Sequence, residues 1–164
     1  MHLNKIKDIK ELMPIIEKLK KENKKIVFTN GCFDILHLGH IRYLNEAKKL
    51  GDILIVAVNS DTSVLKLKGS KRPLYPQYAR LEALAALFCV DYVTFFNELD
   101  PYKIISQIVP HILVKGGDYQ IEKIIGRDIV CSHGGEVVII PELEGFSTTK
   151  LISTIVEKYG KEII

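Results

Sequence analysis

One stretch of the chain decides the fold: Lys25-Ile-Val-Phe-Thr-Asn-Gly-Cys-Phe-Asp-Ile-Leu-His-Leu-Gly-His40. Its first five residues form a short apolar run rich in β-branched side chains, which is typical of a strand. A turn that contains Gly31 follows, and residues 39–50 have the pattern of a helix. The stretch therefore predicts a strand, a turn and a helix in direct succession, which is the repeating unit of an α/β sheet.

The same succession recurs through the rest of the chain. Residues 53–58 form an apolar run without polar alternation, as expected of a parallel strand covered on both faces. Further strands are expected at residues 91–95, 112–115 and 136–140. Helices are expected between and after them, at residues 78–89, from Asp100-Pro101 onward, and at residues 124–132 and 147–159. We therefore predict a Rossmann-like, doubly wound α/β sheet of about five parallel strands with helices on both faces.

The N-terminal residues are expected to extend this sheet domain without forming a second one. Residues 1–24 are predicted to be a helical extension that packs on a single domain of residues 25–164. Apolar side chains recur at helical spacing over residues 8–23. Pro14 fits only the first turn of a helix, which places the expected start of this helix near Met13.

The composition narrows the class of protein. With 47% hydrophobic residues, 26% charged residues and a net charge of +3, the chain has the composition of an ordinary globular protein. A nucleic-acid-binding domain usually has a denser basic face, so nucleic acid is not an expected partner. No apolar stretch approaches the roughly 18 residues of a membrane span, and the N-terminus lacks the apolar core of a signal peptide. The three cysteines form no CxxC pair, and we expect a cytoplasmic protein.

Polar clusters follow several of the predicted strands. They are residues 30–40, 59–61, 115–119 and 145–149. In doubly wound sheets, ligands bind beyond the carboxyl ends of the strands, where the winding direction reverses. These clusters are therefore the candidate binding segments.

Two histidines stand at the predicted entrance of the first sheet helix, in the segment His37-Leu-Gly-His40. Gly39 leaves room for a phosphate to approach the backbone, and a helix N-terminus offers unpaired N–H groups and a partial positive charge. Both imidazoles would reach one anion there and stabilise a leaving pyrophosphate. The same spacing also suits structural or surface histidines, or a metal site, although neither an HExxH motif nor an obvious third ligand accompanies the pair.

Other candidate side chains lie further along the chain. Ser147 can cap the last helix, and the hydroxyl and N–H groups of Gly145-Phe-Ser-Thr-Thr149 can also bind a triphosphate. Lys68 and Arg72 lie on what is expected to be a mobile basic loop, either solvated or placed over a phosphate site. Asp118 would bind a sugar hydroxyl or a cation, or merely start a turn.

Together these segments resemble the cytidylyltransferase-like family of nucleotidyltransferases. The marks of that family are a GxFDxxHxGH entrance and a late GxSTT segment, and both stand in the right order within about residues 25–156. Inside the family, the chain is most similar to the adenylyltransferase half of the bifunctional heptose kinase/adenylyltransferase. The segments that carry this likeness are Phe28 to His40, Ala57 to Asp61, Leu67-Lys-Gly69, Arg72-Pro73, Leu113 to Tyr119 and Glu144 to Thr149.

The resemblance implies transfer of AMP from ATP to D-glycero-D-manno-heptose 1-phosphate by in-line displacement at the α-phosphorus. Mg²⁺ would arrive with the triphosphate, without dedicated metal ligands in the protein. Catalysis is assigned to His37, His40 and Lys68. Nucleotide binding falls to Asn30, Gly31, Cys32, Phe33, Gly39, Asp118, Gly145, Phe146, Ser147 and Thr148, and binding of the sugar phosphate falls to Asp34, Arg72 and Lys115.

The resemblance also implies partners and leaves alternatives open. We expect a homodimer that acts after a separate heptose kinase and supplies ADP-heptose for a cell-envelope polysaccharide such as lipopolysaccharide. A cytidylyltransferase acting on glycerol 3-phosphate usually has an Arg-Thr pair before its Glu-Gly-Ile-Ser-Thr-Thr segment, where this chain has Glu142-Leu143. A non-catalytic nucleotide-binding regulatory module is the alternative from a different class, although neither the histidines nor the Ser-Thr hydroxyls are lost.

Overall fold

The computed structural model describes residues 2–117 and 120–160. Its centre is a sheet of five parallel strands in the order β3-β2-β1-β4-β5. The strands are β1 (Ile26–Gly31), β2 (Ile53–Asn59), β3 (Tyr92–Phe96), β4 (Ile112–Gly116) and β5 (Glu136–Ile140). The predicted Rossmann-like sheet is confirmed, and the order of its strands reverses at β1, between β2 and β4.

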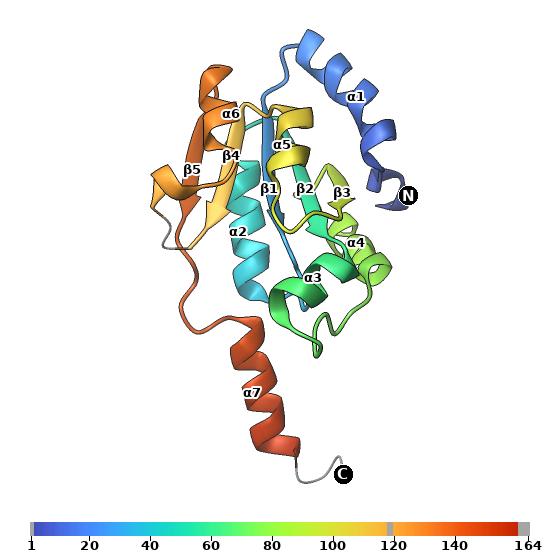
Figure 1. Cartoon of the computed structure of the whole chain (residues 1–164), viewed down its shortest axis with the longest axis vertical. Helices are drawn as coiled ribbons and strands as arrows, with labels where there is room; N and C mark the ends of the chain where they lie inside the picture. Colours follow the sequence, from blue (N-terminus) through green and yellow to red (C-terminus); the bar gives the residue numbers. More distant parts are fainter. Residues whose placement is uncertain (1, 118–119, 161–164) are drawn as a thin grey trace.

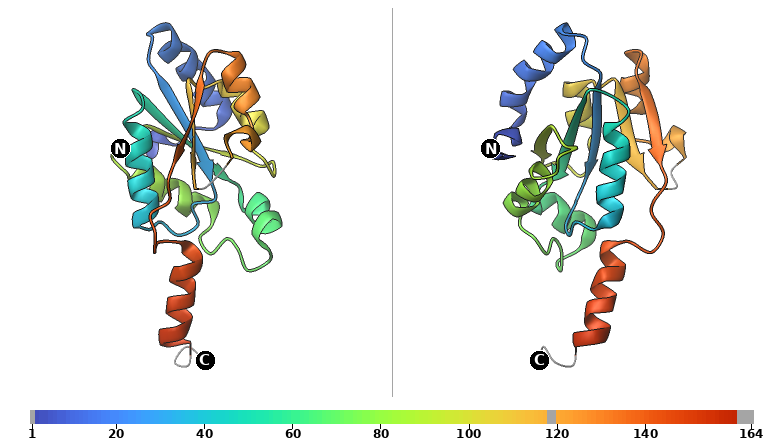
Figure 2. Two further views of the ribbon diagram at one scale, coloured as in Figure 1. Left: turned by 90° about the vertical axis from the view of Figure 1, so that its left-hand side faces the viewer. Right: turned by 180° about the vertical axis from the view of Figure 1, so that it is seen from behind.

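Helices cover both faces of the sheet (Figure 1, Figure 2). The helices α2 (Leu38–Lys48) and α4 (Gln77–Ala85) bury apolar side chains against one face. On the other face, apolar side chains come from α1 (Ile9–Lys21), α5 (Tyr102–Ile108) and α6 (Arg127–Ser132). The domain is therefore a three-layer sandwich with a separate hydrophobic cluster on each side of the sheet.

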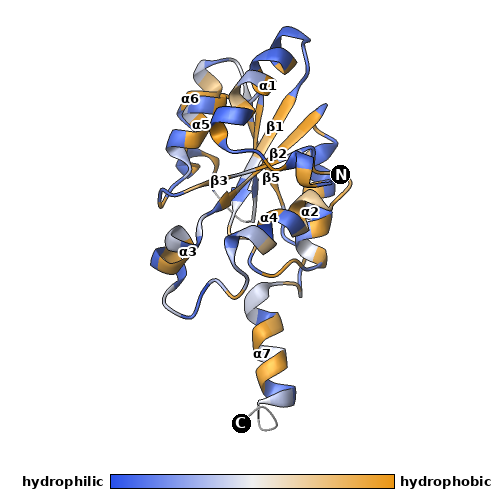
Figure 3. Cartoon of the chain, turned by 90° about the vertical axis from the view of Figure 1, so that its right-hand side faces the viewer, coloured by the Kyte–Doolittle hydropathy of each residue, from blue (hydrophilic) through white to orange (hydrophobic). Residues whose placement is uncertain are grey.

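Successive residues of β2 alternate between these two clusters. Leu54 and Val56 pack with α2 and α4, whereas Ile55 and Ala57 pack with α1 and α5. All four side chains are fully buried. Burial on both faces explains why β2 is apolar from Ile53 to Val58, and the strands are mostly hydrophobic in the colouring of Figure 3.

The N-terminal segment closes one edge of the sheet. A short 3₁₀ helix, η1 (His2–Lys5), leads to Ile6, which pairs with Val93 of β3 in a parallel bridge. Leu12 and Ile16 of α1 are then buried in the same cluster as α5. The N-terminal helix thus contributes to the core of the sheet domain.

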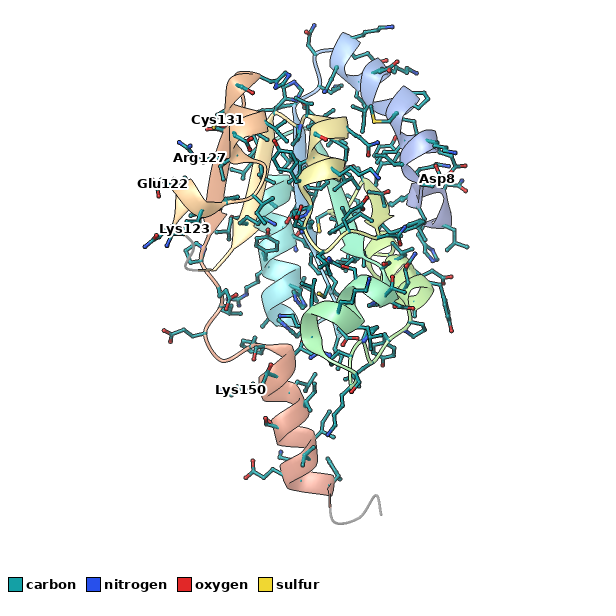
Figure 4. All side chains as sticks on the ribbon, in the orientation of Figure 1. Asp8, Glu122, Lys123, Arg127, Cys131 and Lys150 are labelled. Atoms are coloured by element: carbon teal, nitrogen blue, oxygen red, sulfur yellow. The ribbon has the colours of Figure 1, made fainter. Side chains whose placement is uncertain are left out.

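The helix α1 begins at Ile9, so the predicted start near Met13 was wrong. A reciprocal capping box fixes the true start. Oδ1 of Asp8 accepts the N–H of Glu11 at 2.9 Å, and Oε2 of Glu11 accepts the N–H of Asp8 at 3.2 Å. Asp8 is labelled at this end of α1 in Figure 4. Pro14 lies inside the helix, where its cost is offset by the cap and by the buried face of α1.

The predicted mobile loop around Lys68 begins with a helix that the sequence analysis missed. This helix, α3 (Asp61–Lys68), is capped by Ser60, whose Oγ accepts the N–H of Ser63 at 3.3 Å. Only Ser63 and Val64 of α3 are buried, so the segment lacks the apolar stripe by which helices are recognised. Lys68 is the last residue of the helix.

Two predicted helices are shorter in the structure. The helix α4 ends at Ala85, four residues before its expected end, in a turn that leads to β3. The segment predicted as a helix over residues 124–132 begins only at Arg127, after Gly126 with φ of +87°. A second 3₁₀ helix, η2 (Ile121–Lys123), precedes it. A left-handed glycine interrupts the helical path, which accounts for the late start.

The last helix, α7 (Thr148–Tyr159), leaves the body of the domain (Figure 1, Figure 2). None of its residues is buried, and Leu151, Ile155 and Val156 are exposed. In Figure 4, Lys150 marks its first turn, below the carboxyl ends of the strands. No helix in the described part of the chain is long and apolar enough to cross a membrane.

Candidate active site

A cavity of about 560 Å³ opens beyond the carboxyl ends of the strands, which is a volume typical of small-molecule sites. Its walls come from the ends of β1, α3 and β4, the start of α2, and the segment that leads into α7. The predicted site residues that line it are Asn30, Gly31, Cys32, Phe33, Asp34, His37, Gly39, His40, Lys68, Arg72, Lys115, Phe146, Ser147 and Thr148. Gly145 is not among the lining residues, and Asp118 falls outside the described residues.

The two histidines lie together at the N-terminus of α2. His37 is the N-cap residue, with an extended backbone and no side-chain capping bond, so its imidazole is not used to satisfy the helix end. The rings of His37 and His40 are stacked, with centroids 3.8 Å apart and planes inclined by 22°. Phe33 packs against His40 with centroids 5.3 Å apart. His37, Gly39 and His40 all line the cavity, so both histidines and the start of α2 contribute to one site.

Both histidines are neutral at pH 7 in the free protein. Burial, assisted by the neighbouring His37, lowers the pKa of His40 to about 4, against a smaller opposing effect of the Ile35 carbonyl. Burial also lowers the pKa of His37, and the carboxylate of Glu142 opposes it. Nδ1 of each ring is buried without a partner at hydrogen-bonding geometry within the described residues. An anion in the cavity would supply the negative charge that these rings lack.

Gly39 brings α2 close to the turn that precedes α7. A Cβ atom at position 39 would lie 3.0 Å from Nδ1 of His37 and 3.4 Å from Cβ of Phe146. A larger residue would therefore push the His37 ring or the Phe146 segment away. The glycine of the HLGH segment permits two helix N-termini to meet at one place.

The second of these N-termini belongs to α7. Ser147 is its N-cap, as predicted, and Oγ of Ser147 accepts the N–H of Lys150 at 3.1 Å. Thr148 and Thr149 also line the cavity. The hydroxyls and the free N–H groups of this first turn offer a further set of donors to an anion.

A basic wall stands on the side of the cavity formed by α3 and the segment after it. Lys68 and Arg72 both line the cavity. Nε of Arg72 is bonded to Oδ2 of Asp34, whose side chain is only 1% exposed. Oδ1 of Asp34 also accepts the N–H groups of Leu74 at 2.8 Å and Tyr75 at 2.9 Å. Asp34 was predicted to bind substrate, but its oxygens here hold the segment that carries Arg72.

These contacts outweigh the burial of Asp34. Burial alone would raise the pKa of its carboxyl, but the N–H groups of Tyr75 and Leu74 and the guanidinium of Arg72 hold that pKa below its usual value. The carboxylate is therefore ionised at neutral pH, and its negative charge is matched by Arg72.

Arg80 is a positioning residue that the sequence analysis missed. Its side chain is fully buried, and it donates to the carbonyl oxygens of Cys32 at 2.6 Å and Tyr75 at 3.0 Å and to Oδ1 of Asp61 at 2.8 Å. It thereby joins the segment after β1 to the start of α3 and to the basic wall. The available signal was a single arginine among the apolar residues of α4, next to Leu81.

Lys115 lies at the floor of the cavity, at the end of β4. Its Nζ donates to Oδ1 of Asn30, at the end of the adjacent strand β1. Burial lowers the pKa of Lys115 to about 8, so the side chain is still mostly charged at pH 7. The other lining residues are Asn59, Gly116 and Thr149, which belong to predicted binding segments, and Tyr43, Leu67, Pro141, Glu142 and Leu143, which do not.

The Cys32 thiol does not have the properties of a catalytic nucleophile. Burial raises the pKa of the Cys32 thiol, which keeps it protonated and a weak nucleophile at neutral pH. No group of three His, Cys, Asp or Glu side chains within residues 2–117 and 120–160 is arranged to hold a metal ion. The cavity is built mainly to receive anions.

Comparison with known protein families matches residues 28–154 to the Cytidylyltransferase-like family. The chain is 51% identical to the bifunctional protein HldE of Geobacter metallireducens over 96% of its length, and 54% identical to that of a Nitratiruptor species over 90%. These alignments cover 32% and 31% of the two relatives. The chain therefore spans about a third of the length of the curated relatives it matches.

Two solved structures share the fold. A lipopolysaccharide core biosynthesis protein from Thermoplasma volcanium is 34% identical with a TM-score of 0.60, over 73% of this chain and 97% of that one. Pantoate-beta-alanine ligase from Francisella tularensis has a TM-score of 0.63 at 20% identity, over 96% of this chain and 78% of that one. The second likeness is one of fold alone.

Proposed function

Because the chain belongs to the cytidylyltransferase-like family and is a nucleotidyltransferase, we propose that it transfers AMP from ATP to D-glycero-D-manno-heptose 1-phosphate. The products would be ADP-heptose and pyrophosphate. One observation carries the proposal: the HLGH segment and the GFSTT segment, far apart in the sequence, line a single cavity. The similarity to bifunctional HldE proteins and to a lipopolysaccharide core biosynthesis protein supports this acceptor.

The reaction is an in-line displacement at the α-phosphorus of ATP. An oxygen of the sugar phosphate forms the new bond to phosphorus as the bond to pyrophosphate breaks, and no covalent enzyme intermediate is needed. His37 and His40 donate hydrogen bonds to the departing phosphates, and the N-termini of α2 and α7 add their N–H groups. Lys68 provides a fixed positive charge on the opposite wall.

Mg²⁺ enters this proposal as part of the Mg·ATP substrate. Mg²⁺ commonly keeps several waters and is held by substrate phosphates with one or two carboxylates. The described residues form no three-ligand cluster, and Asp34 is engaged by Arg72. Among residues 2–117 and 120–160, Glu142 is the other carboxylate that lines the cavity, and it would hold the phosphate-bound ion directly or through water.

The acceptor and the setting are also part of the proposal. A separate kinase would supply the heptose 1-phosphate, and the reaction would take place in the cytoplasm. A homodimer is proposed because α7 exposes Leu151, Ile155 and Val156, an apolar face that the described chain leaves uncovered.

Pyrophosphate release tests the substrates directly. ATP and CTP are each combined with heptose 1-phosphate, glycerol 3-phosphate and ethanolamine phosphate. We expect turnover with ATP and heptose 1-phosphate and little with the other pairs. Turnover only with CTP would refute adenylyl transfer, and no turnover with any pair would favour a binding module.

A pair of histidine variants tests the catalytic residues. His40→Ala should lower kcat by about 10²–10³-fold, the scale expected for a lost transition-state donor. His2→Ala changes an exposed histidine of η1 outside the cavity and is the matched control, with kcat within twofold of the parent. Equal kcat values for the two variants would remove the phosphate role from His40.

A further inference from the structure

Lys115 places a charge in the cavity that no described acidic group balances. An ammonium has three N–H donors, and within residues 2–117 and 120–160 a single one is used, by Oδ1 of Asn30. No described carboxylate forms an ion pair with Lys115. An amide oxygen compensates a buried positive charge only in part, so the side chain is arranged to meet an anionic ligand.

The place of this side chain in the sheet is central. The register pairs Thr29 of β1 with Val114 of β4, so the next residues, Asn30 and Lys115, lie side by side across the strands. This is the point where the strand order reverses, and its crevice is where ligands bind in sheets of this kind. Lys68 and Arg72 lie on another wall, beyond β2.

Lys115 and the groups suited to the leaving phosphates belong to different elements of the cavity. The N-termini of α2 and α7, with both histidines, form the region suited to the leaving phosphates. Lys115 lies beside Asn30, at the ends of β4 and β1. The α-phosphate is the group that the acceptor attacks, and it gains charge in the transition state, so it requires a positive group in addition to those that hold the pyrophosphate.

We propose that Lys115, aligned by Asn30, binds a non-bridging oxygen of the α-phosphate, the group that is transferred, and not the sugar phosphate that the resemblance implies for it. This inference rests on the proposed function. Lys115 then neutralises charge on the phosphoryl group itself, whereas the histidines act on the pyrophosphate that leaves. Asn30 is a positioning residue, because its oxygen fixes the direction of the ammonium.

Fragments of the nucleotide separate these roles. AMP and CMP carry the α-phosphate alone, and inorganic pyrophosphate stands for the leaving group alone. Dissociation constants are measured by calorimetry for the whole chain and for Lys115→Met, which keeps the length and apolar stem of the side chain. We expect Lys115→Met to weaken binding of the preferred monophosphate by about 10–100-fold, as for a lost hydrogen bond between charged groups, and binding of pyrophosphate by less than twofold.

Two further variants sharpen the test. Asn30→Asp keeps the lysine but gives it a carboxylate partner, and it should also weaken monophosphate binding by about tenfold or more. Lys24→Met removes an exposed lysine outside the cavity and is the matched control, with all constants unchanged within twofold.

Three outcomes would contradict the inference. An equal loss of pyrophosphate binding in Lys115→Met would move Lys115 to the leaving-group region. Unchanged monophosphate binding, or none by the wild-type chain at millimolar concentration, would remove the α-phosphate contact. A preference for CMP over AMP would refute adenylyl transfer, and the effect of Lys115→Met on CMP would still decide the role of Lys115.

Discussion

The phenolic oxygen of Tyr43 lies 2.6 Å from Oγ1 of Thr29 and 3.2 Å from the carbonyl oxygen of Val114. Because Tyr43 donates its proton to Val114, the hydroxyl of Thr29 is the donor in the shorter bond. Thr29 and Val114 immediately precede the two residues at the floor of the cavity. Tyr43 therefore fixes α2, the helix that begins in the HLGH segment, against both strands at the point where Asn30 and Lys115 meet.

Replacing Tyr43 tests this connection. Tyr43→Phe leaves the buried hydroxyl of Thr29 without that acceptor, so we expect the free energy of unfolding to fall by about 1–3 kcal/mol. Urea denaturation measures the change. In the double variant of Tyr43→Phe and Thr29→Val, the free energy of unfolding should fall by less than the sum of the two single losses, because the two hydroxyls share one hydrogen bond. Strict additivity would contradict the connection.

The low pKa of His40 predicts a pH dependence of stability. Its folded-state value of about 4 lies below the roughly 6.5 of an unfolded histidine, so the unfolded chain binds the additional proton between these values. The contribution to stability is fully present above about pH 6.5 and is lost as the pH falls toward 4. Because His40 is partly exposed, we expect this contribution to the free energy of unfolding to be about 2 kcal/mol.

The variant His40→Asn removes this titration. Its free energy of unfolding, measured by urea denaturation from pH 7 to pH 4.5, should fall less steeply than that of the parent. The comparison uses the difference between the two profiles, because burial also lowers the pKa of His37 and of His111 in both proteins. Parallel profiles would show that His40 titrates normally in the folded chain.

The carboxylate of Asp34 should hold the segment that carries Arg72 in place. Asp34→Asn removes the charge that holds Arg72 and two backbone N–H groups. We therefore expect the free energy of unfolding to fall by about 2–4 kcal/mol. Trypsin should also cut faster after Lys71, inside the released segment. Glu98→Gln breaks the exposed pair with Lys103 at 2.8 Å and is the control, with a change below about 0.5 kcal/mol. Equal effects of the two variants would contradict the role of Asp34.

Pro14 should be a weak point of α1. Its ring provides no N–H for the carbonyl of Lys10, one turn earlier, and its side chain is exposed. Pro14→Ala should therefore raise the free energy of unfolding by about 1–3 kcal/mol, as thermal or urea denaturation will show. An unchanged or lower stability would mean that the restriction proline imposes on the unfolded chain matters more.

The parts of the fold that could be predicted were those encoded locally. Both-face burial leaves a recognisable apolar run in β2 and at the start of β1, and the HLGH segment follows β1 after a short turn. The helix α3 was missed because Val64 is its only buried apolar residue, so periodicity had nothing to detect. The start of α1 was misplaced because Pro14 was weighed above the capping box of Asp8 and Glu11.

The candidate site was predictable in its members and less so in their partners. The histidines and Ser147 were found because they occupy recognisable positions at helix entrances. The resemblance implies that Asp34 binds substrate, and nothing in the sequence indicates that Arg72, 38 residues away, is its partner. Arg80 was missed for the same reason, since its three partners come from separate segments. Contacts of this kind arise only when the chain has folded.

The central position of β1 also sets an order of assembly. Asn30 and Lys115 are 85 residues apart in sequence, and β1 reaches its place only when β4 closes against it. Loop closure over such a separation is slow compared with pairing of strands that are near in sequence. During synthesis, the HLGH segment is therefore complete long before Lys115 can join Asn30 at the floor of the cavity. Substitutions in the β1–β4 pair should delay the gain of nucleotide binding more than the appearance of helices.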